Sequence, residues 1–415
     1  MTVLIAGAGI AGLTTALSLH AAGVGGVRVL EAVPELQPVG VGLNILPNAV
    51  RELDELGLLP ALAAVSAETA GLGYYDRRGR LVWSEPRGRD AGYRWPQLSV
   101  HRGGLQFALA VAVGERLGAD AIVTDARVEG FAQLPGGRVE VAVRHPAAGA
   151  VSRLTADVLI GADGAGSAVR AGLHPGEGPS PGNGLVVWRG TTWAAPFLDG
   201  RSMVITGDDR RRAVVHPLSP PGGEDDRALV NWAVARVAGR EAAPGPAGAH
   251  RPVHPRTFVD GFADLAFGWL DVPGLIRGSS EAYAYHPSGR DPLPRWSEGA
   301  VTLIGDAAHA MHPMGSNGAT QTIIDARVLA RELALRPDPR EALAAYEEER
   351  LPVRSRLRRT TGHGGCGEAG GRRETFPGSE LEDFSADFAR LGGFDPDTVN
   401  NRPSYGIGSG ATAHR

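Results

Sequence analysis

A glycine-rich turn near the N-terminus constrains the fold of this chain more than any other feature. Residues 2–6 form an apolar run typical of a strand buried on both faces, and residues 11–22 form an apolar helix. The pattern Gly7-x-Gly9-x-x-Gly12 joins them, and a second predicted strand follows at 27–31. Strand, glycine turn, helix and strand within about thirty residues have the size of one βαβ unit.

Each glycine of this turn is needed for a different physical reason. The first permits a tight turn, the second lets a pyrophosphate approach the backbone, and the third lets helix and strand pack closely. The N-terminus of the helix offers free N–H groups and the positive end of its dipole to that pyrophosphate. Glu31 ends the second strand, where its carboxylate can accept a ribose 2′-hydroxyl. The segment therefore predicts a dinucleotide site, whereas residues 362–367, which repeat the glycine pattern without a preceding strand, predict only a loop.

A second segment favours a flavin over a nicotinamide dinucleotide at this site. Residues 300–305 form a buried strand, so Asp306 projects from the carboxyl edge of the sheet, where α/β proteins bind ligands. Its carboxylate suits the ribityl hydroxyls of a flavin. The stretch from Gly315 to Gly318 then opens a helix whose N–H groups can stabilise a reduced flavin. The alternative is an ordinary strand, loop and helix with Asp306 as an N-cap.

The rest of the chain indicates two domains and a helical end. Helices are predicted at 44–56, 104–117, 318–335 and 340–359, and strands at 122–129, 139–144 and 156–160. Short β-rich runs at 185–192, 203–206, 213–217 and 228–234 predict a largely antiparallel sheet. We therefore expect an α/β fold with a Rossmann-like cofactor domain (1–75, 98–180 and 298–340) and an inserted, mainly antiparallel β-sheet substrate domain (76–97 and 181–297). A helical C-terminal region and tail (341–415) completes it, with one amphipathic piece near 384–391.

Composition excludes several classes of chemistry. The 415 residues are 43% apolar, with a formal charge of −4, which gives no overall attraction for nucleic acid or acidic membranes. All 42 basic residues are arginine, so no lysine amine is available. Cys366 is the only cysteine, which excludes an internal disulfide and a cysteine-based metal site. The uncharged stretch 1–27 contains six glycines and a histidine, so we expect no membrane span and a cytoplasmic location, with no metal.

Three segments, in order, resemble the fingerprints of the single-component flavoprotein aromatic hydroxylases. They are Gly7–Gly12, the stretch Gly161-Ala-Asp163-Gly164-Ala-Gly-Ser167-Ala-Val-Arg170, and Gly305-Asp306-Ala-Ala-His309. The resemblance spans about residues 1 to 360 and is closest to the salicylate-hydroxylase-like branch, especially to members that act on phenazine carboxylates. The segments that carry this closer likeness begin at Val39, Trp83, His101, Val187, Arg290 and Met311.

The resemblance implies a p-hydroxybenzoate-hydroxylase-like fold, one non-covalent FAD, and NADH or NADPH as a transient co-substrate. NAD(P)H would reduce the FAD, O₂ would form a flavin C4a-hydroperoxide, and one oxygen atom would pass to a small aromatic or phenazine-like carboxylate. Loss of the carboxylate would make this an oxidative decarboxylation. No acid–base residue is obligatory, so the chain would mainly orient the ring and exclude water.

The resemblance also assigns residues to the cofactor. Arg102 and Gln106 would contact the FAD phosphates and ribityl region, Val128 the adenine through its backbone, and Asp306 the ribityl chain. Asp163 has two interpretations, a cofactor contact or a cap on the following helix. Those expected to line the isoalloxazine are Gly42, Gly315, Asn317 and Gly318, and Pro313 with Gly315 would position the loop at its reactive edge.

Candidate substrate residues come mainly from the inserted sheet. Val187, Arg189 and Thr191 alternate onto one strand face, and Arg189 at its centre can clamp a carboxylate with two parallel hydrogen bonds. Its alternative role is a surface salt bridge. Further candidates are His216 and Tyr285, each with a structural alternative, and His312 and Met314 beside the flavin loop.

Two other functions stay open at this stage: a flavin reductase that inserts no oxygen, and a flavin-binding protein without turnover. A lysine-dependent flavin halogenase is excluded, because the chain has no lysine. The choice of aromatic substrate, of NADH or NADPH, and of a monomer or a homodimer is not decided by the sequence.

Overall fold

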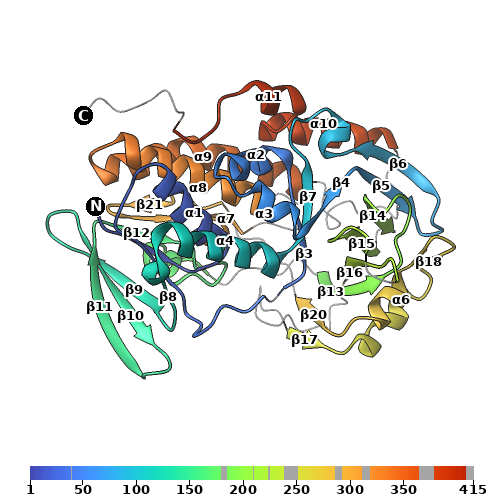
Figure 1. Cartoon of the computed structure of the whole chain (residues 1–415), viewed down its shortest axis with the longest axis horizontal. Helices are drawn as coiled ribbons and strands as arrows, with labels where there is room; N and C mark the ends of the chain where they lie inside the picture. Colours follow the sequence, from blue (N-terminus) through green and yellow to red (C-terminus); the bar gives the residue numbers. More distant parts are fainter. Residues whose placement is uncertain are drawn as a thin grey trace.

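The computed structural model describes residues 1–38, 40–178, 185–208, 210–222, 225–237, 251–285, 292–310, 318–363 and 378–407. A six-stranded sheet at one end of the molecule has the order β21-β22-β12-β1-β2-β8 (Figure 1). Its strands are β21 (Ser297–Glu298), β22 (Val301–Leu303), β12 (Val158–Gly161), β1 (Val3–Ala6), β2 (Val27–Leu30) and β8 (Ile122–Val123). All neighbours pair in parallel except β21 with β22.

The centre of this sheet is buried on both faces. Every residue of β1 and β12 is buried, as the continuous apolar runs predict. Helix α1 (Ile10–Ala21) packs between α4 (Arg102–Leu117) and α8 (Gly318–Leu335). An antiparallel three-stranded sheet, β9 (Arg127–Gln133), β10 (Val139–His145) and β11 (Ala150–Ala156), joins this half.

Two predicted elements are wrong in detail, for local reasons. The predicted strand at 122–129 is divided into β8 and β9, because Asp125 between them adopts a left-handed φ of 52°. The predicted helix at 44–56 begins only at Pro47, as α2 (Pro47–Glu55), because residues 42–45 pair as β3 (Gly42–Ile45) with β7 (Gln97–His101). Proline at the first helical position is favourable, since its missing N–H is not needed there.

The second large sheet has eight strands in the order β17-β20-β13-β16-β15-β14-β5-β6. They are β17 (Arg251–Val253), β20 (Ala282–Tyr285), β13 (Leu185–Ala194), β16 (Ala228–Val237), β15 (Arg211–Pro217), β14 (Ser202–Gly207), β5 (Gly71–Asp76) and β6 (Leu81–Pro86). Only β14 and β5 pair in parallel. The predicted α/β fold with an inserted antiparallel sheet is therefore confirmed. The exact division into domains stays a prediction, and β5 pairs with the second sheet.

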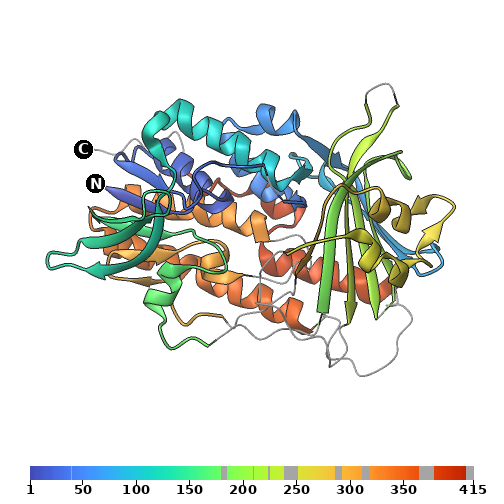
Figure 2. The same cartoon turned by 90° about the horizontal axis from the view of Figure 1, so that it is seen from below.

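The two faces of this sheet have different surroundings. On the outer face, Trp188, Trp232 and Val234 pack in one core with Phe258 and with α6 (Val272–Arg277). Arg189, Ala233 and Val214 lie on the inner face and are only half-buried, whereas His216 and Asn231 on the same face are buried. Figure 2 shows α6 and its neighbours on one side of the sheet, with the six-stranded-sheet half on the other side.

Another three-stranded sheet joins the two halves. Its order is β3-β7-β4, with β4 at Ser66–Thr69. Asn231 of β16 accepts a hydrogen bond from the Gly42 backbone N–H at 2.8 Å, so the inner face of the large sheet abuts β3. A Cβ on Gly42 would lie 2.6 Å from the Asn231 Cβ, which leaves no room for any side chain there.

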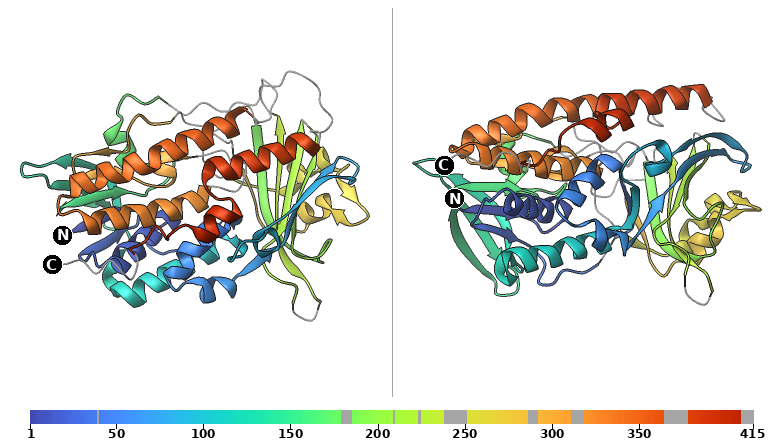
Figure 3. Two further views of the ribbon diagram at one scale, coloured as in Figure 1. Left: turned by 90° about the horizontal axis from the view of Figure 1, so that it is seen from above. Right: turned by 45° about the horizontal axis from the view of Figure 1, so that its top comes forward.

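The C-terminal region is helical, as predicted, and runs back along the molecule (Figure 3). Helix α9 (Pro339–His363) packs on α8, and α10 (Gly378–Gly392) packs on α9 and β6. Sequence reasoning missed α11 (Pro396–Asn401), which starts with an Asp395 cap. Glu52 of α2, fully buried, accepts hydrogen bonds from Ser404 Oγ at 2.9 Å and from Arg327 Nε at 3.3 Å, which fixes the chain after α11.

The remaining elements are short. They are α3 (Leu59–Ala63), α5 (Ala168–Leu173), α7 (Asp306–His309), β18 (Ala266–Phe267), β19 (Leu270–Asp271) and the 3-10 turns Gly88–Ala91, Ala119–Ala121, Pro255–Thr257 and Val259–Phe262. Gly362 and His363 of the second glycine pattern end α9, and the rest of that pattern lies outside the described residues. In the part of the chain that the structure describes, no helix has the length and apolar character needed to cross a membrane.

Candidate functional site

The glycine turn between β1 and α1 is built for close backbone contact. A Cβ on Gly12 would lie 1.9 Å from the Gly7 carbonyl oxygen. Gly7 has a φ of 99°, and a Cβ there would meet the Ala162 carbonyl oxygen at 2.7 Å. Gly9 differs, because a Cβ on it would meet nothing within 4 Å. Gly7 and Gly12 are therefore required by the protein itself, whereas the space in front of Gly9 fits a ligand.

The N-terminus of α1 faces this space. Gly9 is its N-cap residue, and no side chain among the described residues caps it. The first N–H groups of a helix need partners, and an anion at this end also interacts favourably with the helix dipole. This arrangement fits the pyrophosphate of a dinucleotide.

Glu31 lies at the same edge, as the sequence predicts. Its Oε2 accepts a hydrogen bond from the Ala8 N–H at 2.8 Å, and its Oε1 accepts one from the Val33 N–H at 3.0 Å. These contacts fix the carboxylate beside the glycine turn, and each oxygen keeps a second lone pair for a hydroxyl ligand.

Of the further predicted cofactor residues, Gln106 contacts the glycine turn directly. Gln106 donates from Nε2 to the Ala8 carbonyl at 2.7 Å. Arg102 is one helical turn earlier on α4, exposed, and packs on Gly40. The Ala126 N–H donates to the Glu31 carbonyl at 2.8 Å, which brings the start of β9, with the buried Val128, to the end of β2.

The third fingerprint, which begins at Gly305, lies against the first. Gly305 ends the strand segment with a φ of 62°, and a Cβ there would lie 3.0 Å from the Ala11 Cβ of α1. Asp306 follows as the exposed first residue of α7. Segments near residues 10 and 305 therefore lie against each other, and Asp306 stands beside the start of α1.

The middle fingerprint has a strong structural role. Asp163 accepts hydrogen bonds from Ser167 Oγ at 2.5 Å and from the Ala168 N–H at 2.8 Å, at the start of α5. Burial raises the pKa of Asp163, while these hydrogen bonds act in the opposite direction. Its carboxylate thus serves the helix-cap alternative, and its contact with the cofactor stays a prediction.

On the inner face of the large sheet, the predicted substrate residues Arg189 and Tyr285 meet. The Arg189 Cζ lies 4.2 Å from the centroid of the Tyr285 ring. The Arg189 Nε is buried without a hydrogen-bond partner, and no described carboxylate forms an ion pair with this guanidinium. The alternative of a surface salt bridge is therefore not seen among the described residues.

His216 lies elsewhere on the same face, in a buried polar network between the sheets. Its Nε2 is 3.0 Å from Asn231 Nδ2 and 3.5 Å from Asn44 Nδ2, so the ring accepts from the amide groups. Ser99 Oγ donates to Asn44 Oδ1 at 2.6 Å. Burial lowers the pKa of His216 to about 4, so the imidazole is neutral at neutral pH. These contacts favour its structural alternative over a substrate contact.

The other predicted residues of the flavin loop are not placed by the structure. His312, Pro313, Met314, Gly315 and Asn317 lie outside the described residues. Gly318 is described and begins α8.

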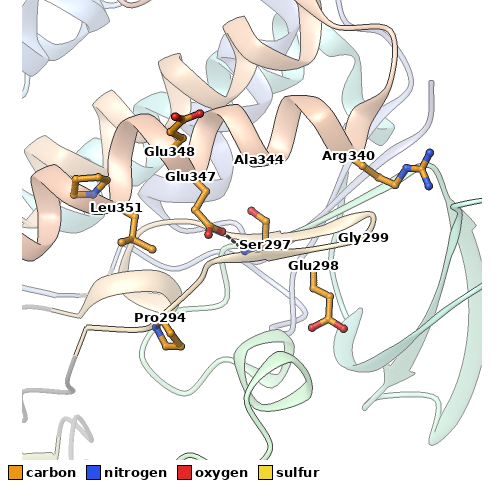
Figure 4. Close-up of a pocket in the computed structure, with 10 residues that line it drawn as sticks. Pro294, Ser297, Glu298, Gly299, Arg340, Ala344, Glu347, Glu348 and Leu351 are labelled. Atoms are coloured by element: carbon orange, nitrogen blue, oxygen red, sulfur yellow. Dashed lines mark hydrogen bonds between the residues drawn. The ribbon is translucent and has the colours of Figure 1, made fainter.

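Two surface grooves lie away from all these residues. One, of about 450 Å³, runs between β21 and α9, where Glu347 accepts hydrogen bonds from the backbone N–H groups of Trp296 and Ser297 (Figure 4). The other, of about 830 Å³, follows β17 and β20 at the edge of the large sheet. Neither contains a predicted cofactor residue. Among the described residues, no group of His, Cys, Asp or Glu could hold a metal ion.

Comparison with known proteins decides the family. The family model described as an FAD binding domain matches residues 1–204 and 274–361, which is more than half of the chain. The chain belongs to this FAD-binding family. FAD is therefore its cofactor, and the glycine turn, the uncapped start of α1 and the Glu31 carboxylate fit that group.

Two relatives define its place in the family, and one solved structure shares its fold. Phenazine 1,6-dicarboxylic acid hydroxylase PhzS of Lysobacter antibioticus is 47% identical over 84% of this chain and 86% of its own length. Salicylate hydroxylase of Pseudomonas putida is 31% identical over 87% and 84%. The crystal structure of Klebsiella pneumoniae HpxO with FAD and uric acid superposes with a TM-score of 0.73 at 22% identity, covering 96% of each chain.

These findings confirm the predicted resemblance: this member of the FAD-binding family is an FAD-dependent aromatic monooxygenase. The two alternatives, a reductase without oxygen insertion and a non-catalytic flavin-binding protein, lose support. The roles of the individual site residues remain predictions.

Sequence reasoning missed several polar residues at the site. Asn231 carries no local signal, since its role depends on a β-sheet register that brings it to Gly42. Arg170 was quoted only as part of the middle fingerprint. It is buried and donates from Nη1 to the Ala307 carbonyl at 2.9 Å, which joins the middle and third fingerprints.

The space in front of Gly9 generates the first prediction. In Gly9→Ala the added methyl group meets no protein atom, but alanine is a poorer N-cap residue than glycine, so the free energy of unfolding of the FAD-free protein should fall by no more than about 1 kcal/mol. The methyl group would crowd the FAD pyrophosphate, and overpacking of that kind weakens binding by about tenfold to a hundredfold. Fluorescence titration with FAD and thermal unfolding of the apoprotein measure the two effects.

Gly114→Ala is the matched control. Gly114 lies inside α4, its added methyl group also meets nothing within 4 Å, and alanine favours a helix by about 0.5–1 kcal/mol. This variant should keep full FAD affinity. Equal FAD affinity in Gly9→Ala and the wild type would contradict the pyrophosphate position.

The buried His216 predicts an acid-sensitive fold. Its pKa is lowered to about 4 in the native state, against 6.5 in the unfolded chain, so between these values only the unfolded state binds the proton. The free energy of unfolding should therefore fall as the pH drops from 6.5 towards 4, by roughly 3 kcal/mol from this group.

Urea unfolding at several pH values measures this dependence. His216→Gln keeps an amide near the Nε2 position but cannot titrate, so its stability should fall less steeply over the same range. An identical pH slope for variant and wild type would show that His216 is not the group responsible.

Proposed function

We propose that this monooxygenase hydroxylates a flat, polycyclic aromatic carboxylate of the phenazine type, with NADH or NADPH as reductant and O₂ as oxidant. The proposal depends above all on Arg189, a half-buried guanidinium on the inner sheet face that no described carboxylate neutralises. Arginine binds carboxylates through two parallel hydrogen bonds, and a substrate carboxylate would supply the missing partner. The relative PhzS, at 47% identity, is a phenazine dicarboxylic acid hydroxylase, which supports the same substrate class.

The residues beside Arg189 suit a flat ring system. In the sheet register Arg189 stands opposite Ala233, which is followed on the next strands by Val214, Ile205 and Tyr74. These neighbours are small or apolar and only half-buried. Four strand spacings separate Arg189 from Tyr74, which is roughly 19 Å. A floor of this length accommodates several fused rings.

Aromatic side chains stand at both ends of this floor. Tyr285 stacks on Arg189, and Tyr74 packs on Trp83 with ring centroids 5.6 Å apart. Burial raises the pKa of Tyr74, so its phenol is un-ionised at neutral pH. Flat aromatic faces and neutral hydroxyls are suitable neighbours for an aromatic substrate.

Bound FAD would supply the redox chemistry, by which electrons pass from NAD(P)H to O₂ and one oxygen atom passes to the ring. The protein itself would orient the substrate and exclude water from the reacting atoms. Arg189 would hold the carboxylate, the inner sheet face would position the ring, and the network of His216, Asn231 and Asn44 would fix the sheet to the FAD half. We include oxidative decarboxylation in the proposal, together with action in the cytoplasm as a monomer or homodimer.

A product assay tests the function. The FAD-loaded protein should oxidise NADH or NADPH faster when phenazine-1-carboxylate or phenazine-1,6-dicarboxylate is present, and faster than with salicylate. The product should gain 16 mass units, or exchange CO₂ for one oxygen atom. Oxidation of NAD(P)H that yields only peroxide with every aromatic carboxylate would contradict the proposal.

Arg189 itself provides the next prediction. A hydrogen-bonded ion pair contributes about 1.5–3 kcal/mol, so Arg189→Gln should lower kcat/KM for a phenazine carboxylate by roughly tenfold to a hundredfold, mainly through KM. The uncharged methyl ester of the same substrate should be affected little. Steady-state kinetics on both compounds measures the difference.

Arg236→Gln is the matched control for this variant. Arg236 also stacks on an aromatic ring, with its Cζ 5.4 Å from the Trp188 centroid, but Trp188 belongs to the outer face. Its kinetics should match the wild type. If Arg189→Gln weakened acid and ester equally, the carboxylate contact would be wrong.

A further inference from the structure

A buried polar cluster joins α7, α8 and α9. Asp325 of α8 is fully buried, and its Oδ2 lies 2.5 Å from His309 Nε2. Its Oδ1 accepts a hydrogen bond from Arg350 Nε at 2.7 Å. Arg350 also donates from Nη2 to Gln321 Oε1 at 2.7 Å. One carboxylate thus connects three helices.

The charges in this cluster determine its hydrogen bonds. Burial lowers the pKa of Arg350, but Asp325 together with Tyr405 and Tyr346 outweighs the effect of burial and leaves the pKa above its usual value. A carboxylate beside a permanent cation is an anion and can only accept hydrogen bonds. His309 must therefore donate from Nε2–H, and the contact is a directed, charge-assisted hydrogen bond.

The cluster holds α7 against the start of α8. His309 is the last residue of α7, and Gln321 and Asp325 lie on one face of the first two turns of α8. The His309 ring also packs on Trp296, with centroids 5.2 Å apart. From the other side, Arg170 donates to the Ala307 and Ala308 carbonyls. These contacts fix both the orientation of α7 and its position relative to α8.

The two elements that this cluster joins carry expected flavin contacts. Asp306 begins α7 and Gly318 begins α8, and both are expected at the FAD. We propose that His309 is a positioning residue for the flavin: its hydrogen bond to Asp325 sets the distance between α7 and α8, and thereby directs oxygen to the substrate rather than to peroxide.

The reduced enzyme can react with O₂ in two ways. In the coupled reaction, NAD(P)H, H⁺, O₂ and the aromatic substrate give NAD(P)⁺, the hydroxylated product and water. In the uncoupled reaction, NAD(P)H, H⁺ and O₂ give NAD(P)⁺ and H₂O₂. The ratio of the two depends on how the flavin is held relative to the substrate, so a small movement of α7 changes the ratio more than it changes FAD binding.

Two polar substitutions at one position test the hydrogen bond. The amide nitrogen of His309→Gln can occupy the Nε2 position and donate to Asp325, whereas the shorter side chain of His309→Asn cannot reach it. We expect His309→Asn to release about threefold or more peroxide per NAD(P)H oxidised. His309→Gln should restore most of the coupling. Both should fold, because neither places an apolar group against Asp325.

A second readout needs no substrate. The visible absorbance and circular dichroism of bound FAD report the surroundings of the ring, and they should change in His309→Asn but not in His309→Gln. The control is Glu52→Gln, which weakens another buried ion pair on α8, that of Glu52 with Arg327. Arg327 is two residues beyond Asp325 and contacts α2 on another side of the helix. This variant should lower thermal stability without altering coupling or the flavin spectrum.

The measurement of coupling rests on the proposed function, whereas the flavin spectra do not. The possible results therefore distinguish failure of the proposed function from failure of the positioning role of His309. A wild type that makes only peroxide with all aromatics would contradict the proposed function, while the flavin spectra would still test His309. Unchanged spectra and coupling in His309→Asn, or equal losses in His309→Asn and His309→Gln, would overturn the positioning role.

Discussion

Backbone contact at the carboxyl ends of β1, β12 and β22 is the constraint on which the rest of the structure depends. Gly7 stands against the Ala162 carbonyl, Gly12 against the Gly7 carbonyl, and Gly305 against Ala11. A side chain at any of these three positions would be crowded, so the segments near residues 7, 162 and 305 can meet because Gly7, Gly12 and Gly305 carry none. Their meeting places the N-terminus of α1, the Glu31 carboxylate and Asp306 around one space. The FAD site is therefore a consequence of how the sheet packs, and needs few dedicated side chains.

The second sheet must be held at a fixed distance from that space, and buried neutral polar groups hold it there. His216, Asn231 and Asn44 connect the inner sheet face to β3 through hydrogen bonds that carry no net charge at neutral pH. Such contacts are directional, so they fix the register between the sheets more narrowly than apolar packing would. The middle of the inner face, at Ala233 and Val214, is only half-buried by the described residues. A rigid edge and an accessible apolar centre would suit the proposed flat ring.

Much of the FAD half could be predicted from local patterns, and little of the substrate half could. The strand at 2–6, the glycine turn and the helix from Gly318 follow from apolar periodicity and from steric requirements that a short stretch expresses by itself. The roles of Asn231 and His309 depend on partners 189 and 16 residues away, so no local pattern reports them. The division of 122–129 at Asp125 was equally hidden, because aspartate tolerates a left-handed backbone without requiring one. Tertiary pairing decided these positions.

The absence of lysine makes the arginines informative about function. Every side-chain cation that is permanently charged in this chain is a guanidinium, whose planar fork favours carboxylates. The four buried arginines in the described part of the chain follow this rule: Arg51 pairs with Glu55, Arg170 with Glu177, Arg327 with Glu52, and Arg350 with Asp325. Arg189 departs from it, since its described neighbour is an aromatic ring. Partial burial of a cation without an anion costs free energy. A fold keeps such a site only where another interaction offsets that cost. A carboxylate that arrives with the substrate would satisfy that condition.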